Sequence, residues 1–522
     1  MFEALCKGLA RKGHQIDMIS HFPLKTPMPN YTDIVDLTGT VKSVVNSFTI
    51  EYGKEIDKHV TYYISTTFGN DFCELMGHEK MQKFIKDPRK PKYDMVLTEY
   101  FGSPCYIGFG EFLKAPVGIV LSSMEWAYID EILGNPLNNA IFPGMFLQKA
   151  VIEDFWDRFY NTIHNFINAR LFFHYTTPQT EMLRKYLDKD LPDVREMEKT
   201  VSLALVNTFP TFHGIRPVTP ALVQVGGLHL EDNEAKLTSE LKAWLDEAKD
   251  GVVYFTLGSL LNIETLPEKT LLDIYESFKK IAPVKVLMKC ADPKKLPPGL
   301  PTNIRTQPWL PQLPILRHKN TKVFITHGGL MGSLEALHSG VPLIGIPVFA
   351  DQNRNINIFV HKKMAVVLDV DNINKKALDA ALNEVLNNPM YMKNAKKQAA
   401  LFKDRPMSAL ETASYWIEYV IRHGPNSLKS PAVHTTWWQN YLLDVYALLL
   451  SCLLGVLAVL LFTVKLVVRK LQGTPDTRVP ISPRKIQFRI CLSPELFRLI
   501  QKQYHNLNFL ENIHEIPHLE RV

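Results

Sequence analysis

The second half of the chain alternates apolar runs with amphipathic runs, and this pattern constrains the fold more than any other feature. Between 251 and 370, the strand-length apolar runs read VVYFTLG, VKVLMK, TKVFIT, VPLIGIP and MAVVLDV. Helix-length runs at 267–281, 330–338 and 375–386 separate them. Strands that are apolar on both faces and alternate with helices form a parallel sheet covered on both sides. The alternation therefore predicts an α/β, doubly wound fold.

The first half shows the same pattern less regularly. An amphipathic helix over the first twelve residues precedes the strand QIDMIS, and a long helix is predicted within 151–173. Further strands are predicted at 93–99, 117–122 and 202–208. A helix that opens the chain is the second half of a βαβ unit. We therefore expect the leading strand, and a signal peptide, to precede Met1.

The polar segment HLEDNEAKLTSELK separates the two halves and lacks strand character, so we predict two α/β domains. The predicted parts are a first domain at 1–228 that lacks its first strand, a linker at 229–242, a second domain at 243–424, a stalk at 425–444, a transmembrane helix at 445–464 and a cytosolic tail at 465–522.

The transmembrane prediction rests on the uncharged run VYALLLSCLLGVLAVLLFTV at 445–464. At about 1.5 Å per residue, a helix of this length spans the ~30 Å hydrocarbon layer. Trp437, Trp438 and Tyr441 precede it like an interfacial aromatic belt, and basic residues follow from Lys465 onward. The positive-inside rule then places the tail in the cytosol and the main body in the lumen. A buried core helix, the alternative, would not need these flanks.

Charge and cysteine usage narrow the function classes. The formal net charge is +6, and the main body shows no basic face, so nucleic acid is not an expected partner. The six cysteines show neither CxxC spacing nor an even framework, so we expect neither a disulfide scaffold nor a zinc site.

A glycine-rich turn in the second domain predicts a phosphate site. The strand TKVFIT ends at His327, and Gly328, Gly329 and Gly332 lead into a helix. A helix N-terminus offers free N–H groups to an anion, and glycine lets the backbone approach closely. Ser259, after VVYFTLG, predicts a second phosphate-sized loop. Tight packing and an ordinary β–α turn are the alternatives for the two features taken alone.

Neighbouring residues extend this site. Trp309 could stack on a base, and Gln312 could contact the base edge or a ribose. Glu335 could accept ribose hydroxyls, and Asp351 with Gln352 could hold a sugar. Singly, these residues could be a core tryptophan, a helix-capping acid and a helix N-cap. Jointly they lie at strand ends along one sheet edge, which predicts a nucleotide-sugar site.

The order WLPQ, THGG, Glu335, GVP and Asp351-Gln352 resembles the signature of the UDP-glycosyltransferase family, and RKGHQIDMIS resembles its N-terminal segment. The membrane-bound insect members, which are similar to UDP-glucuronosyltransferases, resemble the chain most. The resemblance implies GT-B architecture: two Rossmann-like domains facing across a cleft, with a C-terminal transmembrane helix. The second domain would bind the UDP-sugar, and the first a small lipophilic acceptor.

The resemblance also implies the role of each donor-site residue, and neither a metal nor a cofactor, since the UDP-sugar is a co-substrate. Uracil would stack on Trp309, and the ribose would contact Gln312 and Glu335. The expected diphosphate contacts are Ser259, His327, Gly332 and the loop residues Gly329, Met331 and Ser333, and the expected sugar contacts are Asp351 and Gln352.

Chemistry in the family is an inverting displacement in which a histidine takes the acceptor proton and a carboxylate orients that histidine. Glu99 occupies the position of the carboxylate, where many members have aspartate. By the same resemblance, the base histidine falls before Met1. His14 and His21 do not match its position.

Three functions remain open from the sequence. The first is transfer of glucose or glucuronic acid to small lipophilic hydroxyl compounds, as in detoxification, at the endoplasmic reticulum membrane. The second is a UDP-sugar-binding protein without a catalytic base. The third, a nucleotide-sugar epimerase, is disfavoured by the membrane anchor. Loops at 43–77 and 129–146 are expected to form the acceptor pocket. The sequence leaves the acceptor, the choice of sugar and the oligomeric state open.

Overall fold

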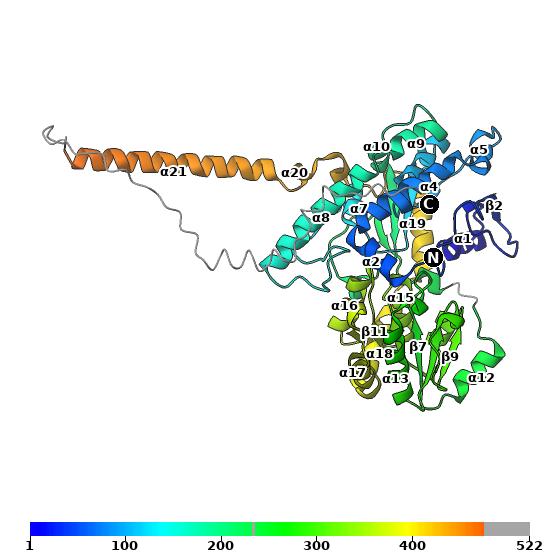
Figure 1. Cartoon of the computed structure of the whole chain (residues 1–522). Helices are drawn as coiled ribbons and strands as arrows, with labels where there is room; N and C mark the ends of the chain where they lie inside the picture. The colour runs from blue at the N-terminus through cyan, green and yellow to red at the C-terminus, as the bar shows by residue number, and fades with distance from the viewer. Residues whose placement is uncertain (232–234, 474–522) are drawn as a thin grey trace. The chain divides into compact units, whose positions relative to one another are not determined.

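The computed structural model describes residues 1–231 and 235–473 (Figure 1). Part of the expected linker and most of the expected tail, from 474 onward, therefore lie outside the described residues. Contacts divide the chain into one compact unit at Met1–Leu443 and a second unit that begins at Asp444. The first unit contains both α/β domains.

The second domain is built on a six-stranded parallel sheet of order β12-β11-β10-β7-β8-β9. This confirms the doubly wound sheet. Its strands are β7 (Val252–Thr256), β8 (Lys285–Lys289), β9 (Ile304–Gln307), β10 (Thr321–Thr326), β11 (Leu343–Gly345) and β12 (Ala365–Val367). Its helices are α12 (Ser239–Glu247), α13 (Glu268–Lys280), α14 (Gln312–Leu316), α15 (Leu330–Ser339), α16 (Gln352–His361), α17 (Lys375–Asn387) and α18 (Pro389–Lys403).

Two apolar cores cover the two faces of this sheet, because successive side chains of a strand point to opposite sides. Tyr254 and Phe324 stack at 5.2 Å between ring centres, in the core that includes α14, α15 and α16. Phe255 and Ile325 face the other core, with α13 and α17. Burial on both faces explains why these strands read as continuous apolar runs.

The first domain contains two parallel sheets. One pairs β1 (Ile16–Ser20) with β2 (Tyr31–Asp36), and the other has the order β3-β4-β5-β6. The strands of the second sheet are β3 (Val96–Glu99), β4 (Val117–Leu121), β5 (Val201–Val206) and β6 (Leu222–Gln224). Among the described residues, β1 and β3 are not paired. The sequence had not predicted β2 or β6.

Most helices of the first domain contribute buried side chains to the core around the four-stranded sheet. The helices of this domain are α1 (Phe2–Arg11), α2 (Ile50–Lys58), α3 (Val60–Ser65), α4 (Asp71–Glu74), α5 (Glu79–Lys86), α6 (Gly108–Leu113), α7 (Ala127–Leu133), α8 (Phe155–Tyr175), α9 (Gln179–Tyr186), α10 (Val194–Glu198) and α11 (Pro210–His213).

Two helices cross the expected domain boundary. Helix α19 (Ala409–His423), expected in the second domain, packs its buried side chains into the first-domain core beside α1, β5 and β6. In the opposite direction, Ile50 and Ile56 of α2 enter a core of the second domain. The expected division at 424 therefore needs a correction, because the chain returns to the first domain before it leaves the body.

A disulfide joins Cys73 of α4 to Cys105, a pairing that the sequence analysis did not predict. The two residues are 32 positions apart and show no motif spacing, so only the fold brings them together. Cys6, Cys290 and Cys452 are free.

Helix α21 (Leu443–Leu471) contains the run expected to be transmembrane. It is 29 residues long with a mean hydropathy of 2.8, so its length and composition suffice to cross a membrane. The short helix α20 (Trp437–Asn440) precedes it.

Candidate functional site

The residues expected to bind a nucleotide sugar follow the carboxyl ends of the second-domain strands. Ser259 follows β7, Trp309 follows β9, His327 follows β10 and Asp351 follows β11. Because the strands are parallel, these ends lie along one edge of the sheet, where open α/β sheets bind ligands.

His327 lies between two glycines that leave room for its ring. A Cβ added to Gly258 would lie 2.4 Å from His327 Cε1, and one added to Gly329 would lie 2.7 Å from Nε2. Gly258 also has a φ of +83°, which favours glycine. Burial, with a smaller effect from Lys289, lowers the pKa of His327 to about 4. The imidazole is therefore neutral at physiological pH and can donate one hydrogen bond to a phosphate oxygen.

Lys289, at the end of β8, supplies a cation that the sequence analysis missed. Its Nζ donates to the carbonyl oxygen of Gly258 at 2.7 Å and to Asn46 Oδ1 at 2.5 Å. Its side chain is buried, and burial lowers the pKa of the ammonium group. A lysine that ends an otherwise apolar strand was the available signal. This cation and the neutral His327 lie at the carboxyl ends of β7, β8 and β10. Together they make this part of the sheet edge suited to a diphosphate.

Trp309 presents its ring to solvent at this edge. Its side chain is 59% exposed, so core packing, the alternative considered from the sequence, is wrong. Lys289 Nζ lies 5.6 Å from the ring centre, which brings the aromatic surface beside the part of the edge that suits a diphosphate. An exposed ring in this position is available to stack on a nucleobase.

Gln312 and Glu335 form one hydrogen-bonded pair. Gln312 Nε2 donates to Glu335 Oε2 at 2.6 Å, and Tyr254 Oη donates to Gln312 Oε1 at 3.4 Å. Burial raises the pKa of Glu335. His229 Nε2 lies 3.8 Å from Glu335 Oε1, but burial lowers the pKa of His229 to about 3, so this imidazole is neutral. The second oxygen of Glu335 can accept ribose hydroxyls.

Gly332 and Ser333 lie in the first turn of α15, where the N–H groups before Ser333 lack helical partners and that of Ser333 donates to the Gly329 carbonyl oxygen at 3.0 Å. Ser333 Oγ is buried without a hydrogen-bond partner among the described residues. A Cβ on Gly332 would lie 3.0 Å from Gln312 Nε2, so glycine permits the approach of Gln312. The turn thus brings a helix N-terminus beside the Gln312–Glu335 pair.

Asp351 and Gln352 are held in different ways. Asn355 Nδ2 donates to Asp351 Oδ2 at 2.7 Å, and burial raises the pKa of Asp351 to about 6. Gln352 is buried, and its Oε1 accepts the backbone N–H groups of Val348 and Phe349 at 2.8 and 3.1 Å. Gln352 Oε1 therefore shapes its own loop, and Asp351 is the better placed of the two to accept sugar hydroxyls.

Part of the first-domain segment that was expected to face the acceptor contacts loops at the same edge of the second-domain sheet. Asn46 N–H donates to the Ser259 carbonyl oxygen at 2.8 Å. Asp57 Oδ1 accepts the N–H of Ala350 at 2.8 Å, and Ala350 has a φ of +58°. The segment 46–58 therefore supports both the loop at Ser259 and the loop at Ala350. No signal in the sequence indicated this arrangement, because the contacts join residues about 200 to 300 positions apart.

Glu99 ends β3, and protein covers only part of its side chain. Desolvation by the surrounding protein raises the pKa of its carboxyl to about 7, while the amino group of Met1 has a smaller, opposite effect. Among the described residues, no histidine forms a hydrogen bond or ion pair with Glu99. His14 instead bonds Glu418 at 3.2 Å, and His21 bonds Thr40 at 3.2 Å, so both have structural partners.

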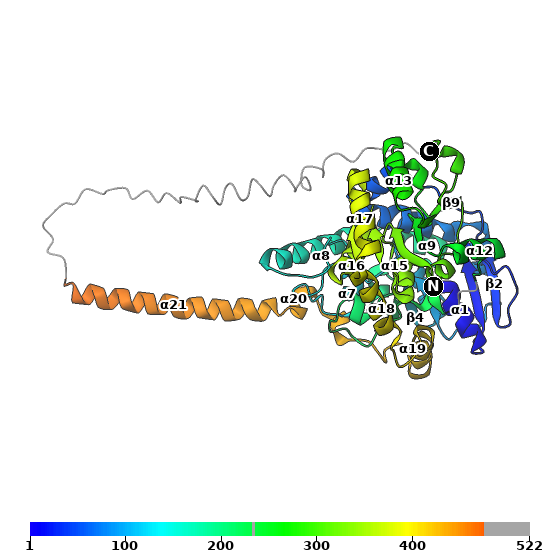
Figure 2. The same ribbon diagram turned by 90° about the horizontal axis from the view of Figure 1, so that it is seen from below.

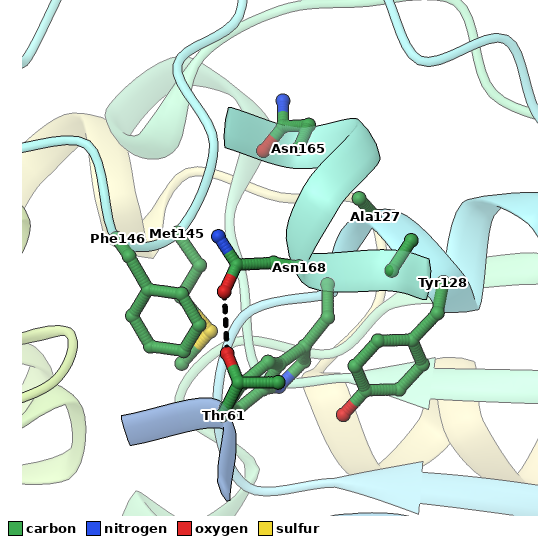
Figure 3. Close-up of a pocket in the computed structure, with 9 residues that line it drawn as sticks. Thr61, Ala127, Tyr128, Met145, Phe146, Asn165 and Asn168 are labelled. Atoms are coloured by element: carbon green, nitrogen blue, oxygen red, sulfur yellow. Dashed lines mark hydrogen bonds between the residues drawn. The ribbon is translucent and has the colours of Figure 1, made fainter. Parts of the chain in front are cut away.

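A small cavity in the first domain lies between the two loops expected to bind the acceptor (Figure 3). Thr61 comes from 43–77, and Met145 and Phe146 come from 129–146. Thr61 donates to Asn168 across the cavity. The space is about 10 Å³, room for about one water molecule, so an acceptor would need these loops to separate.

Comparisons with known proteins agree with this geometry. The family model described as UDP-glucoronosyl and UDP-glucosyl transferase matches residues 25–476. UDP-glucosyltransferase 2 from Dactylopius coccus is 36% identical over 453 residues, which cover 86% of each chain. UDP-glucuronosyltransferase 2B15 from Rattus norvegicus is 30% identical, over 86% of this chain and 87% of its own.

Solved structures show the same fold. The glycotransferase of kitacinnamycin superposes with a TM-score of 0.50 at 16% identity, covering 80% of this chain and 94% of its own. The two α/β domains therefore have the GT-B fold.

Proposed function

This chain belongs to the UDP-glucuronosyl and UDP-glucosyl transferase family, and on that premise we propose that it transfers glucose or glucuronic acid from a UDP-sugar to small lipophilic hydroxyl compounds. The observation that carries the proposal is the set of donor groups along one sheet edge. Trp309 offers a surface for the base, and the Gln312–Glu335 pair offers hydrogen-bonding groups for the ribose. Lys289 and His327 then face the diphosphate, and the Asp351 carboxylate faces the sugar.

In this proposal, each part of the donor has a partner. Uracil stacks on Trp309, and the ribose hydroxyls donate to Glu335. The diphosphate accepts from His327 and faces Lys289, and the sugar hydroxyls donate to Asp351. Because the charged and polar groups are fixed before the donor arrives, they require little reorganisation on binding.

The reaction is an inverting displacement. The acceptor oxygen attacks the anomeric carbon while the bond from that carbon to the β-phosphate oxygen breaks, and UDP leaves. Lys289 and His327 stabilise the negative charge that develops on the leaving diphosphate. The acceptor proton passes to a base oriented by Glu99, whose carboxyl, with a pKa of about 7, can hold a proton near neutral pH.

We also propose that the protein is a single-pass protein of the endoplasmic reticulum membrane, with its main body lumenal. Helix α21 and the basic residues Lys465, Arg469 and Lys470 near its end support this orientation. The Cys73–Cys105 disulfide supports an oxidising compartment. Detoxification would follow from lipophilic acceptors in such a membrane.

A second candidate is a UDP-sugar-binding protein without transfer activity. The observation that favours it is that no histidine among the described residues bonds Glu99. The two candidates share the donor site and differ only in turnover.

A transfer assay separates them. The full chain in lipid nanodiscs is incubated with a fluorescent phenol and either UDP-glucose or UDP-glucuronic acid, and both UDP release and the conjugate are measured. The transferase proposal expects a conjugate with at least one donor and its loss in Glu335→Ala. Binding of UDP without a conjugate across several phenols would support the second candidate.

A further inference from the structure

Helix α8 has an inside-out distribution of side chains over its first three turns. Its buried positions toward the body are the polar residues Asp157, Asn161 and Asn165. Helices of soluble domains normally bury an apolar stripe and expose a polar one. Apart from Arg158 and Thr162, the exposed residues here are instead apolar or aromatic. They are Phe155, Trp156, Phe159, Tyr160, Ile163 and Phe166, called the α8 aromatic face below.

The polar stripe fixes this orientation. Asn161 Oδ1 accepts the N–H of Gly144 at 2.8 Å, and Asn161 Nδ2 donates to the Phe142 carbonyl oxygen at 2.8 Å. Asn165 Nδ2 donates to Asn139 Oδ1 at 2.8 Å. Rotating the helix to bury its aromatic residues would break these bonds and leave buried polar groups unpaired. The exposed aromatic surface is therefore built into the fold.

The α8 aromatic face is continuous along the helix. Phe155, Phe159, Ile163 and Phe166 are spaced four, four and three residues apart, so they lie on one side. Their exposed fractions are 59%, 46%, 43% and 44%. Figure 1 and Figure 2 both show the first half of α8 projecting beyond the strands of the first domain. A contiguous apolar surface of this kind marks an interaction site rather than scattered surface residues.

The face joins the residues that lead into the candidate membrane helix. The ring of Phe166 lies 5.7 Å from that of Trp437 in an edge-on arrangement. Trp437, Trp438 and Tyr441 are themselves exposed, by 44%, 39% and 45%, and α21 begins at Leu443. The aromatic surface therefore runs from α8 to within a few residues of the helix that is long and apolar enough to cross a membrane.

We propose that the α8 aromatic face lies in the interfacial layer of the same membrane that α21 enters, so that the first domain rests on the bilayer surface. Phenylalanine, tryptophan and tyrosine suit this layer because they combine apolar area with polar or quadrupolar edges. The proposal rests on α21 being membrane-spanning.

One consequence concerns lipophilic acceptors. The cavity in Figure 3 is lined by Asn165, Asn168 and Ala169, which lie on the body side of α8. With its outer side in the interface, α8 becomes the wall between the bilayer and this cavity. A lipophilic compound dissolved in the membrane would then approach the first domain without crossing bulk water.

The test is a spin-label depth measurement on the full chain in lipid nanodiscs. Labels are placed singly by Trp156→Cys, Phe159→Cys and Ile163→Cys in a background with Cys452→Ser and Cys491→Ser. Phe22→Cys and Ile215→Cys are matched controls, because both native residues are exposed apolar residues of the first domain, by 81% and 75%. A label on native Cys452 in α21, with only Cys491→Ser, reports on the anchor. UDP affinity of each variant verifies folding.

The proposal expects the α8 labels to be more accessible to oxygen than to a polar nickel complex, as residues in a bilayer are, while the labels at 22 and 215 favour the nickel complex. Aqueous accessibility on α8 with a lipid-embedded label on Cys452 would overturn the proposal and leave the anchor intact. If the label on Cys452 is more accessible to the nickel complex than to oxygen, α21 does not span the membrane, and the proposal fails with it. Spin–spin broadening at 159 only in nanodiscs with two chains would show that a second copy covers the face instead.

Discussion

Lys289 Nζ donates to the carbonyl oxygen of Gly258 at 2.7 Å, which fixes a buried cation beside the loop that follows β7. We predict that Lys289→Met weakens UDP binding about 10- to 100-fold, because a charged hydrogen bond contributes about 1.5–3 kcal/mol. Uridine, which lacks phosphate, should bind both proteins equally. Calorimetry with UDP and uridine measures the two effects. Lys285→Met, at the other end of β8, is the control, and an equal loss in both variants would contradict the assignment.

Gly258 is predicted to be required by space as well as by backbone conformation. A Cβ there would lie 2.4 Å from the His327 ring, whereas Gly299, with a similar φ of +89°, has nothing within 4 Å. Gly299→Ala should therefore lower stability by about 1 kcal/mol from strain alone, and Gly258→Ala by about 2–4 kcal/mol. Thermal denaturation of the two variants compares these effects. Equal decreases in the melting temperature of the two variants would show that the His327 ring does not restrict the space at Gly258.

The pKa of Asp351 predicts a pH dependence for donor binding. The carboxyl has a pKa of about 6, and only its ionised form accepts freely from sugar hydroxyls. The affinity for UDP-glucose should therefore be retained above about pH 7 and fall about tenfold as the pH decreases from about 7 to about 5. Asp351→Asn should bind weakly and show no such step. Titrations at several pH values would disprove this role if the variant kept the wild-type profile.

Glu99 is predicted to act on the rate of transfer. Its carboxyl has a pKa of about 7, so the ionised form increases, and the rate should rise, as the pH passes upward through 7. Glu99→Gln should reduce kcat by about a hundredfold or more with little change in the donor KM. Glu99→Asp should recover part of the rate. A pH–rate profile that Glu99→Gln leaves unchanged in shape would assign the titration to another group.

The Cys73–Cys105 disulfide is predicted to stabilise the first domain. Replacing both cysteines by serine should lower stability by about 2–4 kcal/mol, because the unfolded chain gains freedom. Dithiothreitol should lower the melting temperature of the wild type towards that of the double variant and leave the variant unchanged. Cys6→Ser is a control, because Cys6 has no disulfide partner. Insensitivity of the wild type to reductant would mean that the bond does not contribute.

The sequence predicts the second domain well because its strands are buried on both faces and its glycines punctuate strand ends. The expected site residues could be proposed from their positions, because Trp309 follows a strand, Gln312 begins a helix and Asp351 precedes one. Glu335 lies within α15 and was expected in the site because it shares that helix with the glycine turn. Lys289 could have been found as a charged residue at a strand end.

The first domain was harder to predict because its contacts are non-local. Nothing near Asn46 or Asp57 indicates that they hold the donor loops, and nothing near Cys73 indicates its partner. Gln352 was expected to face the sugar. Its orientation is set instead by the N–H groups of Val348 and Phe349 in its own loop, which donate to its Oε1. The sequence predicts α8 as a long helix, but periodicity does not reveal which stripe of that helix is buried.

A single-turnover experiment tests the transferase proposal most directly. UDP-glucose or UDP-glucuronic acid, with its sugar radiolabelled, is bound to an excess of the full chain in nanodiscs, a phenol is added, and the label is followed over time. The account predicts that the label moves from the donor to the phenol as an inverted, β-linked glycoside while UDP is released. A label that stays in the bound donor for both sugars and across several phenols would contradict transfer and leave only donor binding.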